Sequence, residues 1–185
     1  MVFYGLFILC CFLLDSLLSL VFPQSFLPSE MIFVPCLGLA SLVLTQQHLK
    51  KVDAMLLFLI FGIFYDYFIA NTQFLYMIVF AILCILSRFW AKHVMESVLE
   101  CLLLAISTIF VKELIVYLVM RITHATMMSI SMWLVNRLFL TLLINGILIV
   151  IIIFASRVIE DFILMREKRI RKEETVSWLN LRLRR

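Results

Sequence analysis

The stretch FGIFYDYFIANTQFLYM, residues 61–77, places a single carboxylate, Asp66, in one of the most apolar parts of the chain. No Lys or Arg lies within ten residues of Asp66 on either side. A charge in such a segment is costly to bury in hydrocarbon, so its presence needs a physical reason. The solvent that surrounds the segment must be identified first.

Composition predicts that this solvent is lipid. The chain has 185 residues, of which 65% are hydrophobic and 15% are charged, whereas soluble domains are nearer about 45–50% and about 25%. Several apolar runs reach the roughly 17–25 residues that a helix needs to cross a bilayer. Backbone groups in lipid must be hydrogen-bonded internally, and the alternation of a β-barrel is absent. We therefore expect an all-α integral membrane protein.

The apolar runs predict six transmembrane helices in one bundle over residues 1–156. A basic cytoplasmic tail follows over residues 157–185. The first run has neither a basic N-terminal region nor a small-residue cleavage site, so we expect it to be retained. Pro35 interrupts the second run. The expected spans are 2–22, 31–47, 54–70, 73–90, 94–120 and 133–156.

Basic residues predict the orientation of the spans. The loops at 23–30 and 71–72 contain no Lys or Arg, and the loop at 121–132 contains one. The loops at 48–53 and 88–93 contain two each, and the tail contains nine. Because Lys and Arg accumulate on the cytoplasmic side, we expect a multi-pass membrane protein with both termini in the cytoplasm.

Counting along the expected spans places Asp15, Asp66, Glu113 and Arg137 in the outer half of the bilayer. A charge at the bilayer centre costs about 2.5 kcal/mol or more, so such groups usually face the bundle interior and pair. We predict an intramembrane polar cluster of these four residues, with an Asp66–Arg137 pair. The alternative is that each group reaches interfacial water by snorkelling and needs no partner.

The sixth expected span carries a polar stripe. Arg137, Thr141 and Asn145 are spaced by four residues and share one helix face. Such a stripe favours interhelical hydrogen bonds worth about 0.6–2 kcal/mol each. A stripe that lines a ligand site is the alternative.

Catalytic, cofactor and metal sites are not expected. The five Cys lie in apolar segments without a CxxC pair, and the three His show no ligand spacing. No nucleophile motif or Gly-rich phosphate loop is present. The basic tail predicts contact with anionic lipid, or a docking segment for a cytoplasmic partner, rather than nucleic-acid binding.

The expected third and fourth spans resemble the bacterial rod shape-determining protein MreD family. The resemblance rests on the signature turn, in which Gly62 is followed four residues later by Asp66, and on the Arg137, Thr141 and Asn145 pattern of NRLFLTLLINGIL. The family has a similar six-span layout and resembles the substrate-capturing S-components of energy-coupling-factor transporters in fold.

Asp15, Glu113 and Pro35 are also similar to the family pattern. Phe74 departs from it, because the family commonly has Gly shortly after the turn, and the tail is longer and more basic than in many members.

The resemblance implies a non-enzymatic scaffold of the cell-elongation machinery, the elongasome, in the bacterial cell membrane. Such a scaffold binds the single-span protein MreC and supports lateral peptidoglycan synthesis and cell shape. RodA, a penicillin-binding protein and the actin-like MreB are further expected partners. The alternative is a vitamin-capturing subunit of an energy-coupling-factor transporter. The first span of such a subunit usually carries Ala residues for docking, and the first span here has none.

Overall fold

The computed structural model describes residues 2–22, 32–70, 72–91 and 97–183, and these residues form helices without a strand. The long helices are α1 (Val2–Val21), α3 (Lys51–Tyr65), α4 (Leu75–Ala91), α5 (Val98–Ile122) and α7 (Phe139–Leu183). The short helical pieces are α2 (Leu37–Thr45), η1 (Gln46–His48), η2 (Asp66–Ala70), α6 (Ile130–Trp133) and η3 (Leu134–Leu138). Some of the expected features lie outside the described residues. These are the loop at 23–30, part of the loop at 88–93 (residues 92–93), and the starts of two expected spans at 31 and 94–96.

Four of the described helical stretches are long and apolar enough to cross a membrane. They cover 3–21, 51–70, 98–122 and 130–166, and α4 is a shorter apolar helix of 17 residues. Large apolar side chains are exposed on the outside of the bundle, such as Leu20 at 79% and Ile85 at 66%. This all-helical arrangement is consistent with a helical membrane protein, because an aqueous surface rarely exposes so much apolar area.

The second expected span departs most from a regular transmembrane helix. Residues 32–36 are not helical, and α2 covers only nine residues. Pro35 explains the break, because proline disfavours helical geometry in the residue before it and donates no amide hydrogen bond. Every residue from 32 to 46 is buried, and α2 contacts α1, α5 and α7. An irregular backbone therefore lies at the centre of the bundle.

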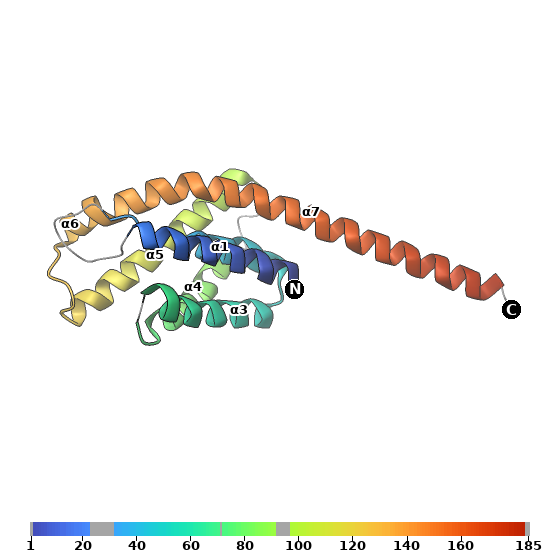
Figure 1. The fold of residues 1–185 in the computed structure, drawn as a ribbon, viewed down its shortest axis with the longest axis horizontal. Coiled ribbons are helices and arrows are strands. Elements are labelled where there is room, and N and C mark those ends of the chain that lie inside the picture. Colours follow the sequence, from blue (N-terminus) through green and yellow to red (C-terminus); the bar gives the residue numbers. More distant parts are fainter. Residues whose placement is uncertain (1, 23–31, 71, 92–96, 184–185) are drawn as a thin grey trace.

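The last helix continues without interruption from the bundle into the tail. Residues 130–183 are helical throughout, with a π-helical turn at η3. No Gly or Pro follows Gly146 to end the helix. Figure 1 shows α7 extending far beyond the other helices.

Three contacts hold α7 where it leaves the bundle. The His48 Nδ1 atom lies 2.9 Å from the Glu160 Oε1 atom. The ring of Phe3 on α1 packs edge-on against Phe162, with centroids 5.8 Å apart, and also lies beneath the Arg166 guanidinium. The start of α1 and the end of η1 therefore contact the same stretch of α7.

Gly62 allows α3 and α4 to approach closely. A Cβ atom at Gly62 would lie 2.8 Å from the backbone Cα of Met77. A backbone atom cannot rotate away as a side chain does, so the two helices would have to separate. The Gly62 position therefore sets the distance between the helices on both sides of the signature turn.

We expect Gly62→Ala to lower the stability of the folded protein by about 1–3 kcal/mol, the usual cost of overpacking. The matched control is Gly5→Ala, because a Cβ at Gly5 has no atom within 4 Å. Thermal unfolding of both variants in the same detergent measures the difference. A Gly62→Ala protein that melts at the wild-type temperature would show that the helices separate without cost.

Candidate intramembrane polar site

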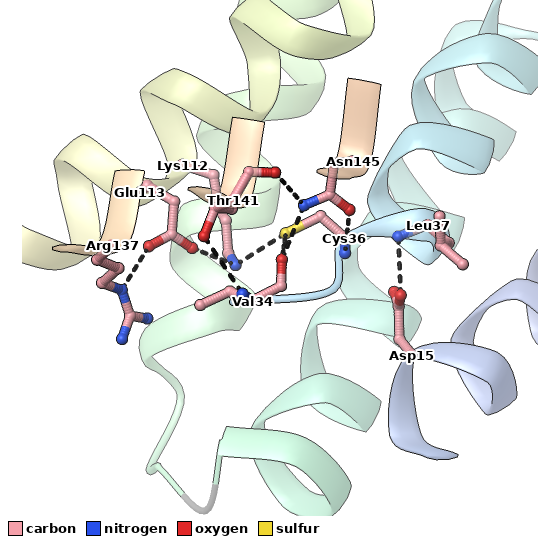
Figure 2. Close-up of polar contacts among 9 residues, drawn as sticks. All are labelled: Asp15, Val34, Cys36, Leu37, Lys112, Glu113, Arg137, Thr141 and Asn145. Carbon is pink, nitrogen blue, oxygen red and sulfur yellow. Dashed lines mark hydrogen bonds and ion pairs between the residues drawn. The ribbon is translucent and has the colours of Figure 1, made fainter. Parts of the chain in front are cut away.

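The irregular segment at 32–36 obtains its hydrogen bonds from side chains of α7. The Asn145 amide donates from Nδ2 to the Val34 carbonyl at 2.8 Å and accepts at Oδ1 from the Cys36 N–H at 3.0 Å. The Thr141 hydroxyl accepts from the Val34 N–H at 3.2 Å. Backbone groups away from water need partners. Thr141 and Asn145 supply partners that a helix would have provided internally (Figure 2).

Asp15 of α1 caps the N-terminus of α2. Its two carboxylate oxygens accept from the Leu37 N–H at 2.8 Å and the Gly38 N–H at 2.7 Å. The side chain is fully buried. The unpaired N–H groups and the dipole of a helix N-terminus both favour a negative charge. A buried carboxylate is stabilised here without a cationic side chain in contact with it.

Three charged side chains form an ion-pair triad between α5 and the start of the last helix. The Glu113 carboxylate binds Lys112 Nζ at 2.8 Å through one oxygen and Arg137 Nε at 2.9 Å through the other. All three side chains are at most 1% exposed. Lys112 Nζ also lies 3.4 Å from the Cys36 sulfur, which joins the triad to the irregular segment.

Two aromatic rings complete the surroundings of Lys112. The ammonium lies 5.2 Å from the ring centroid of Tyr65 and 5.5 Å from that of Tyr76. Both rings are buried, and ring faces attract a desolvated cation. We use the name buried polar network for Asp15, Lys112, Glu113, Arg137, Thr141 and Asn145 together with the backbone that they contact.

Asp66 caps a second helix. Its carboxylate accepts from the Tyr76 N–H at 3.0 Å, the Met77 N–H at 2.9 Å and the Thr72 hydroxyl at 2.5 Å. These donors belong to the first turn of α4 and to the turn that precedes it. Asp66 is 2% exposed, and its role for α4 repeats that of Asp15 for α2.

The four residues of the predicted cluster therefore divide into two kinds. Glu113 and Arg137 contact each other, whereas Asp15 and Asp66 bind backbone N–H groups at helix starts. The predicted Asp66–Arg137 pair is replaced by Glu113–Arg137, and the Asp66 oxygens are occupied within their own hairpin. Depth in the membrane does not decide pairing, because the direction in which each helix face points matters as much.

Sequence reasoning missed Lys112 and Cys36 as members of the network. Lys112 lies next to Glu113, and neighbouring side chains on a helix point about 100° apart, so the sequence does not show that both face the bundle interior. The sequence feature that indicates a role for Cys36 is the preceding Pro35. A proline inside a buried apolar run leaves backbone groups without helical hydrogen bonds, and side chains must then supply the partners.

The geometry defines a helical protein with membrane-length helices and a charged interior. Comparison of the chain with protein-family models, with curated proteins and with solved structures finds no match. No group of three or more His, Cys, Asp or Glu side chains in the described ranges is arranged to hold a metal ion.

Glu113→Gln is expected to be more damaging than Arg137→Gln. Loss of the Glu113 charge leaves two buried cations without their counter-ion, and breaking a buried pair costs about 3–5 kcal/mol. Loss of the Arg137 charge leaves the Lys112–Glu113 pair intact. Yield of monodisperse protein and the unfolding temperature in detergent rank the variants.

Glu160→Gln is the matched control for this ranking. It makes the same chemical change at a partly exposed ion pair, where about 0–1 kcal/mol is expected. Equal losses in Glu113→Gln and Arg137→Gln would show that Glu113 is not the shared centre of the triad.

Phe74→Gly is expected to stabilise the signature turn. Phe74 has a φ of 58°, in the left-handed region that costs a residue with a Cβ about 1–2 kcal/mol. Glycine removes this strain at an entropic cost of about 0.5–1 kcal/mol, so we expect a net gain of about 0–1.5 kcal/mol. The Phe74 side chain is 56% exposed, so little packing is lost.

Phe154→Gly is the control, because Phe154 has the same 56% exposure but lies within α7. This control should melt below the wild type, since glycine weakens a helix interior. A Phe74→Gly protein that loses as much stability as Phe154→Gly would contradict the assignment of strain.

Proposed function

We propose that this chain is a non-enzymatic, MreD-like scaffold of the bacterial elongation machinery. In this proposal the second span crosses the bilayer as a non-helical segment followed by α2, which gives six spans in an S-component-like bundle with both termini in the cytoplasm. An extended residue advances about 3.3 Å, compared with about 1.5 Å in a helix. Residues 32–48 therefore reach about as far as the roughly 30 Å hydrocarbon core.

The observation that carries the proposal is that the buried polar network satisfies itself. Among the described residues, the buried side-chain nitrogen and oxygen atoms without a hydrogen-bond partner are on Gln46, Gln47, Arg88 and Trp133, and none belongs to the network. A site that captures a polar ligand keeps groups available for that ligand. A saturated network instead holds helices in a fixed arrangement.

The residues that carry the family resemblance also have structural roles that suit a scaffold. Gly62 and Asp66 set the α3–α4 hairpin, and Asn145 supports the irregular segment. The lipid-facing surface is apolar, so another protein's span can pack on it by van der Waals contact. We propose that MreC is this partner, that RodA, a penicillin-binding protein and MreB belong to the same assembly, and that the tail contacts anionic lipid.

One feature favours the alternative of a vitamin-capturing transporter subunit. A broken span with a half-helix N-terminus near the membrane interior is a common way to bind an anionic substrate group. Here the N–H groups of Leu37 and Gly38 already bind Asp15. A ligand would have to displace a carboxylate of the protein itself, so we place this function second.

The proposal predicts the composition of a pull-down from bacterial membranes in mild detergent. The tagged wild type should recover an MreC-like single-span protein with wall-synthesis enzymes. Asp66→Ala should reduce this recovery severalfold, because the start of α4 loses its cap. Asp161→Ala makes the same change at an exposed position on α7 and should leave recovery unchanged.

Mass spectrometry of the same eluates covers small molecules as well as proteins. Recovery of a vitamin with an ATPase module would overturn the scaffold in favour of the transporter subunit. Equal partner recovery by a monodisperse Asp66→Ala protein would remove the signature turn from the mechanism.

A further inference from the structure

A groove of about 700 Å³ lies between the start of α3 and the end of α4. Apolar side chains line most of it, including Val52 and Leu56 on one wall and Ile85 and Phe89 on the other. These four side chains are between 51% and 69% exposed. The groove therefore opens on the outer surface of the bundle, where the surrounding medium is lipid.

The charged side chains that line the groove are basic. Lys51 belongs to the first turn of α3, and Arg88 belongs to the last turn of α4. Asp53 lies in the same first turn as Lys51 but does not line the groove. Among the residues that the structure describes, the lining therefore carries two positive charges and no negative charge, which favours an anionic occupant.

Arg88 lines the groove and has one hydrogen-bond donor without a partner. Its Nη2 atom donates to the Leu49 carbonyl at 3.1 Å, whereas its Nη1 atom is buried and has no hydrogen-bond partner. A buried guanidinium N–H without an acceptor costs free energy. Guanidinium groups bind phosphate oxygens strongly, often through two nitrogens.

The start of α3 adds backbone donors beside Lys51. The residue that precedes the helix, Lys50, makes no capping hydrogen bond with its side chain. The first N–H groups of a helix lack partners within the helix, and together with the dipole they attract anions. A Lys in this first turn is unfavourable for the helix alone and becomes favourable when an anion lies between the helix start and Arg88.

We propose that this groove binds one anionic phospholipid, which this chain retains independently of any scaffold partner. The lipid phosphate lies among Lys51, Arg88 and the start of α3, and an acyl chain follows the apolar walls toward the bilayer interior. Lys51 and Arg88 belong to the basic loops at 48–53 and 88–93. This end of the groove is therefore the one that we expect at the cytoplasmic surface of the bilayer. A headgroup at the bilayer surface and a chain within the hydrocarbon fit this polarity.

Native mass spectrometry of the full-length protein in detergent tests the proposal. Phosphatidylglycerol and phosphatidylcholine are added at equal concentrations. The wild type should retain one phosphatidylglycerol, at an occupancy at least about tenfold above phosphatidylcholine. Lys51→Gln with Arg88→Gln should abolish this preference. Equal retention of the two lipids by the wild type would overturn the proposal.

A second double variant locates the anionic-lipid site. Lys168→Gln with Arg169→Gln removes the same charge from exposed positions on the tail helix and should retain the lipid. Loss of the lipid in this variant, with retention in the groove variant, would assign the bound lipid to the tail and contradict the groove site.

A steric variant guards against a folding defect in Arg88→Gln, which also removes the bond to Leu49. Leu56→Trp fills the groove while both basic side chains remain, and it should lose the lipid. Leu17→Trp, at a site on α1 that is 61% exposed, should keep it. Displacement of the lipid by excess inorganic phosphate, or unchanged retention by Leu56→Trp, would show that the walls hold no acyl chain.

Discussion

The non-helical backbone at residues 32–36 is the constraint on which the rest of the structure depends. A bundle interior offers no water to hydrogen-bond exposed N–H and C=O groups, so each must find a protein partner. Asn145 and Thr141 supply partners for Val34 and Cys36, and Asp15 supplies one for the start of α2. These side chains come from two helices at opposite ends of the sequence, and the need to satisfy one short segment brings those helices together.

The same principle explains why the interior carries charges. Asp15 and Asp66 are stabilised by helix N-termini, whereas Glu113 is stabilised by two cations. Buried ion pairs contribute less to stability than they cost to break, and their best-attested benefit is a unique arrangement of the parts. A chain whose apolar faces are all alike has many near-equivalent packings, and the polar contacts select one of them.

The sequence predicts the helical class, the positions of the long helices and the residues that require burial. Hydrophobic run length is sufficient for α1, α5 and the apolar part of α7, because few structures other than a helix fit apolar runs of this length. The partner of Arg137 was not predictable, since a count along the chain measures depth but leaves the rotation of each helix unspecified. The non-helical geometry of residues 32–36 was not predictable either. It depends on Thr141 and Asn145, more than 100 residues away.

The continuous helix from 130 to 183 couples the tail mechanically to the bundle interior. This helix carries Arg137, Thr141 and Asn145 in the bundle, and its charged C-terminal turns extend beyond the other helices in Figure 1. Between these two regions, His48 contacts Glu160 and Phe3 contacts Phe162, so the helix is held in place where it leaves the bundle. A tilt applied to the far end therefore acts on the residues that support the irregular segment, because no Gly or Pro interrupts the helix after Gly146. Force on the far end of α7 is transmitted to the centre of the bundle through a single helix.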